Sequence, residues 1–205
     1  MTSTALPSTV SRTVVVGISG ASGAIYGVTL LRQLRAHADL RVHLVVTPSG
    51  WLNVQHELGM GIAELRTLAD VVHDPADLGA SIASGSFGAA AMVIAPCSMR
   101  TLAAVAHAAS DNLMTRAADV MLKERRPLLL MVREAPLNLA HLRNMVAVTE
   151  MGGIVFPPVP AFYQRPQSVD DLVLHSVQHA LDLLGLDPGG ARARWAGLDP
   201  HSPKA

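Results

Sequence analysis

Short apolar runs alternate with longer helical patterns along most of this chain. The apolar runs lie at 13–18, 42–46, 91–95 and 128–132, and the helical patterns at about 24–37, 99–108, 139–150 and 168–184. Strands that are apolar almost throughout are typical of parallel sheets, because helices cover both faces of such sheets. The alternation therefore predicts a single α/β domain with three layers, in which helices flank a mostly parallel sheet.

The two ends of the chain lack this alternation. Residues 1–12 are rich in Ser, Thr and Pro, and we expect them to form a disordered leader before a domain at 13–185. We expect residues 186–205 to form a C-terminal tail. The Trp195 ring in this tail is expected to pack on the body of the protein or on a neighbouring subunit.

Charge and hydrophobicity limit the classes of partner. Sixteen Lys and Arg residues balance sixteen Asp and Glu residues, and the longest basic segment is the short run at 123–126. This balance argues against nucleic-acid binding and favours a small-molecule ligand. Half of the residues are hydrophobic and only 16% are charged, which favours self-association through surplus apolar surface.

The cysteine count and the apolar segments bear on location. Cys97 is the single cysteine, which excludes an internal disulfide and a cysteine-based metal cluster and suits a reducing cytoplasm. The nine histidines show no metal-binding spacing. No segment reaches the roughly 18 apolar residues of a membrane span, and residues 1–12 lack the apolar run of a signal peptide. We therefore expect a cytoplasmic protein with no metal and no membrane segment.

The Gly-rich loop after the first predicted strand is the first candidate site. Its sequence over 17–24 is GISGASGA, in which glycines permit a tight turn and backbone N–H groups face the start of the next helix. The GxxGxxG spacing differs from the GxGxxG of dinucleotide folds, which favours a mononucleotide phosphate. Taken alone, the loop is equally compatible with a plain tight turn.

Polar residues also follow the other predicted strands. Thr47, Pro48 and Ser49 are typical of a helix cap, and contact with a ligand is the alternative. The segment 96–101 places hydroxyl groups and free amides at another strand-to-helix turn, and two such loops predict a cleft. Cys97 is better explained as a buried structural thiol than as a nucleophile, because its setting is aliphatic.

Charged residues gather around the strand predicted at 128–132. Arg133 and Glu134 follow it directly, at the end of the strand where parallel sheets bind ligands. Arg133 can donate hydrogen bonds to a phosphate, and Glu134 can move a proton. The basic run at 123–126 is also compatible with a solvated helix end. Tyr163 lies in a Pro-containing loop, for which a structural turn and a substrate clamp are equal alternatives.

Five stretches of the chain resemble the UbiX/Pad family of flavin prenyltransferases. They are GISGASGAIYG (17–27), SGSF (84–87), APCSMRTL (95–102), LKERRPLLLMVREAPLNL (122–139) and PPVPAFYQRP (157–166). The resemblance runs from about Arg12 to Trp195, and five motifs in this order make it specific. It implies a flavodoxin-like (Rossmann-like) fold for the flavin-binding domain and a homododecamer with active sites at subunit junctions.

The resemblance also implies a set of site residues. FMN would contact Gly20, Ala21, Ser22, Thr47, Ser98, Met99, Arg100, Thr101 and Arg133. The prenyl donor, dimethylallyl monophosphate, would be bound by Arg116, Lys123, Arg133, Tyr163 and His179, with Arg116 serving the site of a neighbouring subunit. Glu134, Ser22 and Lys123 would be the catalytic residues, and Glu134 would assist proton transfer.

The reaction implied by the resemblance needs no metal. In the family, N5 of reduced FMN displaces phosphate from the allylic carbon, and a second bond to C6 closes a new ring. Cationic and phenolic donors that stabilise the departing phosphate suit this chemistry, as do apolar walls that exclude water. The product, prenylated FMN, would pass to a UbiD-type decarboxylase in ubiquinone synthesis or aromatic-acid decarboxylation.

One position departs from the family pattern. The family carries an arginine on the last helix as a further phosphate ligand, and the corresponding residue here is His179. A histidine with an ordinary pKa of about 6.5 is only partly charged near neutral pH. We therefore expect weaker, pH-dependent donor binding, unless Arg165 or Arg192 takes the place of that arginine.

Two other classes of function are alternatives. A flavin-dependent decarboxylase of a cysteine compound would share the fold, but the chain has Ala135-Pro136-Leu137-Asn138 where such enzymes carry a PxMNxxMW-like clamp. A non-catalytic flavin-binding protein, such as an electron carrier, would bind no prenyl donor. Flavodoxin-like carriers are acidic and stack flavin between aromatic rings, whereas this chain is neutral and only 3% aromatic.

Overall fold

Six parallel strands form one sheet in the computed structural model, which describes residues 12–186. The strands are β1 (Arg12–Ile18), β2 (Leu40–Val46), β3 (Val71–His73), β4 (Ala91–Cys97), β5 (Leu128–Val132) and β6 (Ile154–Val155). They lie in the order β3-β2-β1-β4-β5-β6. This arrangement confirms the predicted three-layer, flavodoxin-like α/β fold.

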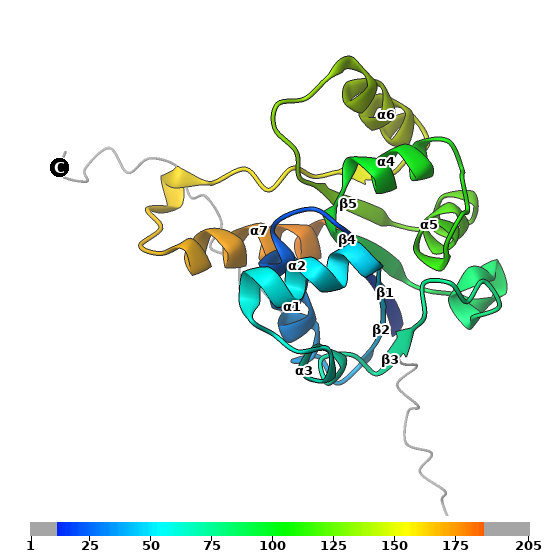
Figure 1. The fold of residues 1–205 in the computed structure, drawn as a ribbon, viewed down its shortest axis with the longest axis horizontal. Coiled ribbons are helices and arrows are strands. Elements are labelled where there is room, and N and C mark those ends of the chain that lie inside the picture. Colours follow the sequence, from blue (N-terminus) through cyan, green and yellow to red (C-terminus); the bar gives the residue numbers. More distant parts are fainter. Residues whose placement is uncertain (1–11, 187–205) are drawn as a thin grey trace, which may run out of the picture.

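Helices cover both faces of the sheet. Across residues 12–186 they are α1 (Ala24–Leu34), α2 (Pro48–Leu58), α3 (Ile62–Arg66), α4 (Met99–Ala106), α5 (Leu113–Lys123), α6 (Leu139–Glu150) and α7 (Val169–Leu183), with short 3-10 helices η1 (Ser81–Ala83), η2 (Gly85–Phe87) and η3 (Phe162–Gln164). Helices α1, α2, α3 and α7 pack on one face, and α4, α5 and α6 pack on the other (Figure 1).

The alternation of side chains along β1 explains why both layers are filled. Val14, Val16 and Ile18 pack in the core cluster that contains α1 and α7, whereas Val15 packs in the cluster of the opposite face. Each of these side chains is at most 1% exposed. Successive side chains of a strand point to opposite faces, so only a run that is apolar throughout satisfies both layers.

The strand order reverses between β1 and β4, and this reversal positions the site. Sheets of this kind bind ligands outside the carboxyl ends of the strands at such a reversal. The residues at this edge are 19–23, 47–49, 98–101 and 133–138, which include the first residues of α2 and α4. Three of the helices that begin at this edge have polar N-caps, which are Thr47 for α2, Ser98 for α4 and Asn138 for α6.

Several boundaries differ from the sequence-based expectation. Helix α1 ends at Leu34, earlier than predicted, and β3, β6 and α3 are too short for periodicity to predict. The expected leader and tail, with Arg192 and Trp195, lie outside the described residues except for Arg12, which begins β1, and Leu186, which is buried. Among the described residues, no helix is long and apolar enough to cross a membrane.

Candidate functional site

One buried serine joins the loops that follow β1 and β4. The Ser19 hydroxyl donates a 2.9 Å hydrogen bond to the carbonyl of Pro96 and accepts a 2.8 Å hydrogen bond from the backbone N–H of Ser98. The backbone N–H of Ser19 donates to the same Pro96 carbonyl at 3.2 Å. Ser19 is fully buried, so these bonds are shielded from water and hold the two loops in fixed positions.

The Gly-rich loop after β1 exposes two of its predicted ligands. Gly20 packs directly on Ser49 of α2, where the Cβ of any other residue would overlap the Ser49 side chain. The Asn53 side-chain amide donates a 2.8 Å hydrogen bond to the carbonyl of Ala21, which fixes the turn. Ala21 itself is buried, whereas Gly20 and Ser22 are exposed and accessible to a ligand.

The N-terminus of α1 binds an anion, and that anion is part of the protein. The Glu57 carboxylate on α2 accepts hydrogen bonds from the backbone N–H groups of Gly23, at 2.9 Å, and Ala24, at 2.8 Å. Gly23 adopts a left-handed conformation with φ 105°, which glycine tolerates best. The predicted anion cradle is therefore occupied at its helical end by a carboxylate. Sequence reasoning missed Glu57, because no local motif links it to the loop.

The hydroxyl groups of the loops after β2 and β4 cap helices. Thr47 Oγ1 accepts a 3.1 Å hydrogen bond from the backbone N–H of Gly50, so the capping interpretation of Thr47 is confirmed. Ser98 Oγ accepts a 3.2 Å hydrogen bond from the backbone N–H of Thr101 and lies 3.1 Å from the Thr101 hydroxyl. Met99 is half-buried between them. Ligand contacts at these residues stay predictions.

A pocket of about 260 Å³ opens beside Thr47 and Arg100. It is lined by Thr47, Pro48, Pro75, Ala76, Arg100, Asp111 and Asn112. Arg100 is exposed, and its guanidinium lies 2.9 Å from the Asp111 carboxylate. A guanidinium, two proline rings and the nearby starts of α2 and α4 suit a flat anionic ligand such as FMN, because helix N-termini stabilise negative charge.

Arg133 and Glu134 extend from the end of β5 into the same edge of the sheet. The backbone N–H of Arg133 donates a 3.1 Å hydrogen bond to the carbonyl of Cys97, which ties β5 to β4. Glu134 is exposed, and its carboxylate accepts a 3.0 Å hydrogen bond from the backbone N–H of Ala135. Burial raises the pKa of Tyr26 on α1, and the charge of Arg133 opposes this shift, which places the phenol near the guanidinium. Tyr26 was not predicted as a site residue, although it lies in the first matching stretch.

Two pairs of rings connect the segment after β6 to α7. Phe156, held by a 2.8 Å hydrogen bond from its N–H to the carbonyl of Leu130, contacts His179 edge-on at a centroid distance of 5.2 Å. Tyr163 contacts His175 edge-on at 6.1 Å. The predicted donor ligands Tyr163 and His179 thus belong to two ring pairs, and both pairs involve α7. His175, one helical turn before His179, was missed, although the four-residue spacing places both on one helix face.

Cys97 ends β4 with its side chain fully buried. Burial raises the pKa of its thiol well above the usual range, so the nucleophilic thiolate is not formed near neutral pH. This confirms the prediction of a structural thiol. Among residues 12–186, no group of three or more His, Cys, Asp or Glu side chains is placed to hold a metal ion.

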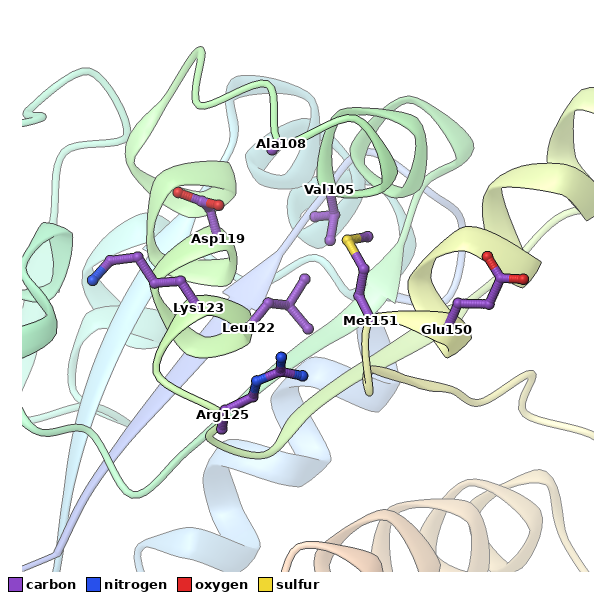
Figure 2. Close-up of a pocket in the computed structure, with 8 residues that line it drawn as sticks. All are labelled: Val105, Ala108, Asp119, Leu122, Lys123, Arg125, Glu150 and Met151. Carbon is purple, nitrogen blue, oxygen red and sulfur yellow. The ribbon is translucent and has the colours of Figure 1, made fainter.

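Two of the predicted donor ligands, Arg116 and Lys123, lie on α5. Arg116 donates a 3.1 Å hydrogen bond to the carbonyl of Ala83 and pairs with Asp119 at 2.8 Å, and Lys123 pairs with the neighbouring Glu124. Lys123 lines a pocket of about 390 Å³ formed by the last turns of α4, α5 and α6, at the amino edge of the sheet. Figure 2 shows the Lys123 amine directed away from Arg125. One copy of the chain therefore does not bring Lys123 to Glu134.

Comparisons with known proteins identify the family. Residues 3–178 match the family model described as Flavoprotein. The flavin prenyltransferase UbiX of Neisseria meningitidis serogroup B is 57% identical over 187 residues, which are 91% of this chain and 98% of that protein.

The structure of AnUbiX (PadA1) in complex with FMN and dimethylallyl pyrophosphate is 45% identical with a TM-score of 0.88, covering 92% of this chain and 99% of that one. A dodecameric FMN-dependent UbiX-like decarboxylase from Escherichia coli O157:H7 is 44% identical with a TM-score of 0.88, covering 91% and 100%. The chain therefore belongs to the UbiX family of flavin prenyltransferases.

Proposed function

We propose that this flavin prenyltransferase transfers the dimethylallyl group of dimethylallyl monophosphate to N5 and C6 of reduced FMN. One observation carries the assignment of the site. Arg133 and Glu134 are exposed at the end of β5, and a chain of hydrogen bonds connects them to the Gly-rich loop. Arg133 bonds to Cys97, and the next residue, Ser98, bonds to Ser19. The Arg133 guanidinium, which can donate hydrogen bonds to a phosphate, the Glu134 carboxylate and the exposed Ser22 hydroxyl thus lie at one edge of the sheet.

The residues of this edge suit the separate parts of the reaction. Bound reduced FMN supplies the nucleophilic nitrogen, and its contacts would come from Gly20, Ala21, Ser22, Thr47, Ser98, Met99, Arg100, Thr101 and Arg133. Arg133 would also share the donor phosphate with Tyr163 and His179, because a guanidinium binds phosphate through two hydrogen bonds. Glu134 is exposed, and its carboxylate would take up a proton. Ser22 would orient the flavin.

We further propose that a neighbouring copy completes each site with Arg116 and Lys123. Lys123 lies at the amino edge of the sheet, away from Glu134, and Arg116 lies on the same helix, α5. The related protein from Escherichia coli O157:H7 is a dodecamer. An apolar stripe on α6 also calls for a covering partner, since Leu139, Leu142 and Val146 are 46–59% exposed. A homododecamer with sites at subunit junctions accounts for both features.

The donor, the acceptor of the product and the location are the finer parts of the proposal. AnUbiX was found with dimethylallyl pyrophosphate, whereas we assign the monophosphate to this chain. Prenylated FMN would be handed to a UbiD-type decarboxylase, for ubiquinone synthesis or aromatic-acid decarboxylation. The reduced, buried Cys97 suits a cytoplasmic setting.

The test is anaerobic incubation of the purified protein with reduced FMN and dimethylallyl monophosphate, followed by mass spectrometry of the extracted flavin. We expect the flavin to gain one dimethylallyl group, and we expect much slower transfer from the diphosphate in a parallel reaction. Transfer from the diphosphate but not from the monophosphate would show that the diphosphate is the donor. Unmodified flavin with both donors would overturn the proposed function, and turnover of a cysteine compound would then identify a decarboxylase.

A further inference from the structure

Two histidines on neighbouring strands share a hydrogen bond. His43 Nδ1 on β2 lies 2.9 Å from His73 Nε2 at the end of β3, and their ring centroids are 5.1 Å apart. His43 is only 4% exposed. One of the two facing nitrogens must donate and the other must accept, so a proton on each of them breaks the bond.

The pair supports a short segment that leads to the cationic surface of α5. The Phe87 ring lies 5.1 Å from the His43 ring, and Phe87 is the last residue of η2. At the other end of η2, Gly85 packs so closely on Lys123 and Glu124 that an added Cβ would overlap the Glu124 carboxylate. Helix η2 is therefore held between the histidine pair and the end of α5.

Two arginines hold the ends of the same segment. Arg116 donates a 3.1 Å hydrogen bond to the carbonyl of Ala83, before η2, and Arg126 donates a 2.8 Å hydrogen bond to the carbonyl of Ala89, after it. In Figure 1 this part of the chain, between β3 and β4, projects beside α5. Any displacement of η2 thus changes the contacts of Arg116 and Lys123, the two cations assigned to the donor.

The charges around the pair come from several elements. Burial lowers the pKa of His43 to about 4, helped by His73 and Arg41 and opposed by Asp70, which precedes β3. Burial also lowers the pKa of His73, and Asp77 in the following loop opposes this shift. The residue of η2 that faces His43 is the uncharged Phe87. Phe87 packs against an apolar cluster to which α5 contributes side chains. The uncharged pair is therefore the stable form at neutral pH.

We propose that His43 and His73 are positioning residues for prenyl transfer. They hold Phe87 and η2 in place, which keeps Lys123 and Arg116 ordered. Protonation of both histidines at acid pH releases η2 and slows the reaction. This inference rests on the proposed function, because it takes Lys123 and Arg116 to bind the donor. Neither histidine is among the residues assigned to the flavin or the donor. Their effect is transmitted through Phe87 and Gly85.

The test replaces the pair with groups that do not titrate, in the full-length protein. Asparagine places an amide near the position of Nδ1 and glutamine near that of Nε2, so H43N and H73Q are combined. We expect wild-type kcat/KM to fall about twofold more than that of the double variant between about pH 6 and pH 4, because about half of the His43 side chains carry a proton at a pKa of about 4. The two proteins should have rates within about threefold of each other at pH 8. H107Q, which replaces an exposed histidine at the end of α4, should keep the wild-type profile. Superimposable profiles for wild type and double variant would overturn the proposal.

A second readout does not depend on activity. Hydrogen exchange of the backbone amides of 84–88, corrected for intrinsic rates, should accelerate at acid pH in the wild type and not in the double variant. If the double variant fails to fold, the less buried His73→Gln is measured alone. Should the wild type make no prenylated flavin at pH 8, the proposed function fails, while the exchange rates still decide whether the pair holds η2.

Discussion

The carboxylate of Glu57, near the end of α2, accepts a 2.8 Å hydrogen bond from the backbone N–H of Ala24, the first residue of α1. It satisfies donors that a helix start leaves unpaired and complements the positive end of the helix dipole. The α1 cap at Gly23 has no side chain of its own to do so. The packing of α2 on α1 therefore sets the shape of the turn that carries Gly20 and Ser22.

Glu57→Ala is expected to loosen this turn. Loss of the capping carboxylate should lower the free energy of unfolding by about 1–2 kcal/mol and weaken FMN binding several-fold. Urea unfolding and a titration of flavin fluorescence measure the two effects. Glu64→Ala on α3 removes the same charge from a side chain outside this contact and is the matched control. Equal FMN affinity in both variants would show that the turn does not depend on Glu57.

Glu134→Gln tests the proton-transfer role at nearly constant shape. The glutamine oxygen can still accept the hydrogen bond from Ala135, so the fold and FMN affinity should be unchanged. Loss of the carboxylate should slow prenylation by about 10²–10⁴-fold, the usual contribution of a positioned acid or base. Anaerobic single-turnover rates measure this loss. Glu64→Gln, at an exposed position of α3, should retain the wild-type rate. A comparable loss of rate in that variant would show that the effect is not specific to Glu134.

Mixing two inactive variants tests whether each site is shared between copies. Lys123→Ala and Glu134→Gln damage different surfaces of the same chain, so a site with Lys123 of one copy and Glu134 of another can be intact in a mixed oligomer. Co-expression should restore about a quarter of the wild-type sites if the copies assemble at random. Each variant expressed alone should stay inactive. Failure of the co-expressed mixture to regain activity would place both residues in a site built from one copy.

The sequence predicted those parts of the fold whose signal is local. Strands β1, β2, β4 and β5 have five to seven residues, most of them apolar, and each was predicted close to its observed limits. Strands β3 and β6, with three and two residues, are too short to show a period and depend on pairing with a longer neighbour.

The candidate site shows the same division between local and distant contacts. Ser98 and Thr47 could be predicted because a hydroxyl before a helical pattern is a local signal for a cap. The contact of Glu57 with Ala24 spans 33 residues, and that of His43 with His73 spans 30. Both depend on how elements pack in three dimensions, so no spacing within the sequence predicts them. The separation of Lys123 from Glu134 likewise follows from the direction of α5.

Cys97 should be inert toward alkylation in the folded protein. Its buried thiol has a pKa raised above the usual range, so the reactive thiolate is absent at pH 8 as well as at pH 7. Iodoacetamide should label the cysteine only after unfolding by denaturant, as followed by mass spectrometry. Cys97→Ala should keep prenylation within about threefold of the wild type while lowering stability by about 1 kcal/mol, because a small cavity remains. Labelling of the native protein at the rate of free cysteine would contradict this account.

His179 is expected to make donor binding depend on pH. A protonated imidazole binds phosphate and a neutral one loses that attraction, so the donor KM should rise by about three- to tenfold from pH 5.5 to pH 8. In His179→Arg the side chain stays charged, so the donor KM should be lower than in the wild type and should change less with pH. The donor phosphate itself loses a proton near pH 6, but this affects both proteins equally. The informative quantity is thus the ratio of the two KM values, and a ratio that stays constant over this range would exclude His179 as a phosphate ligand.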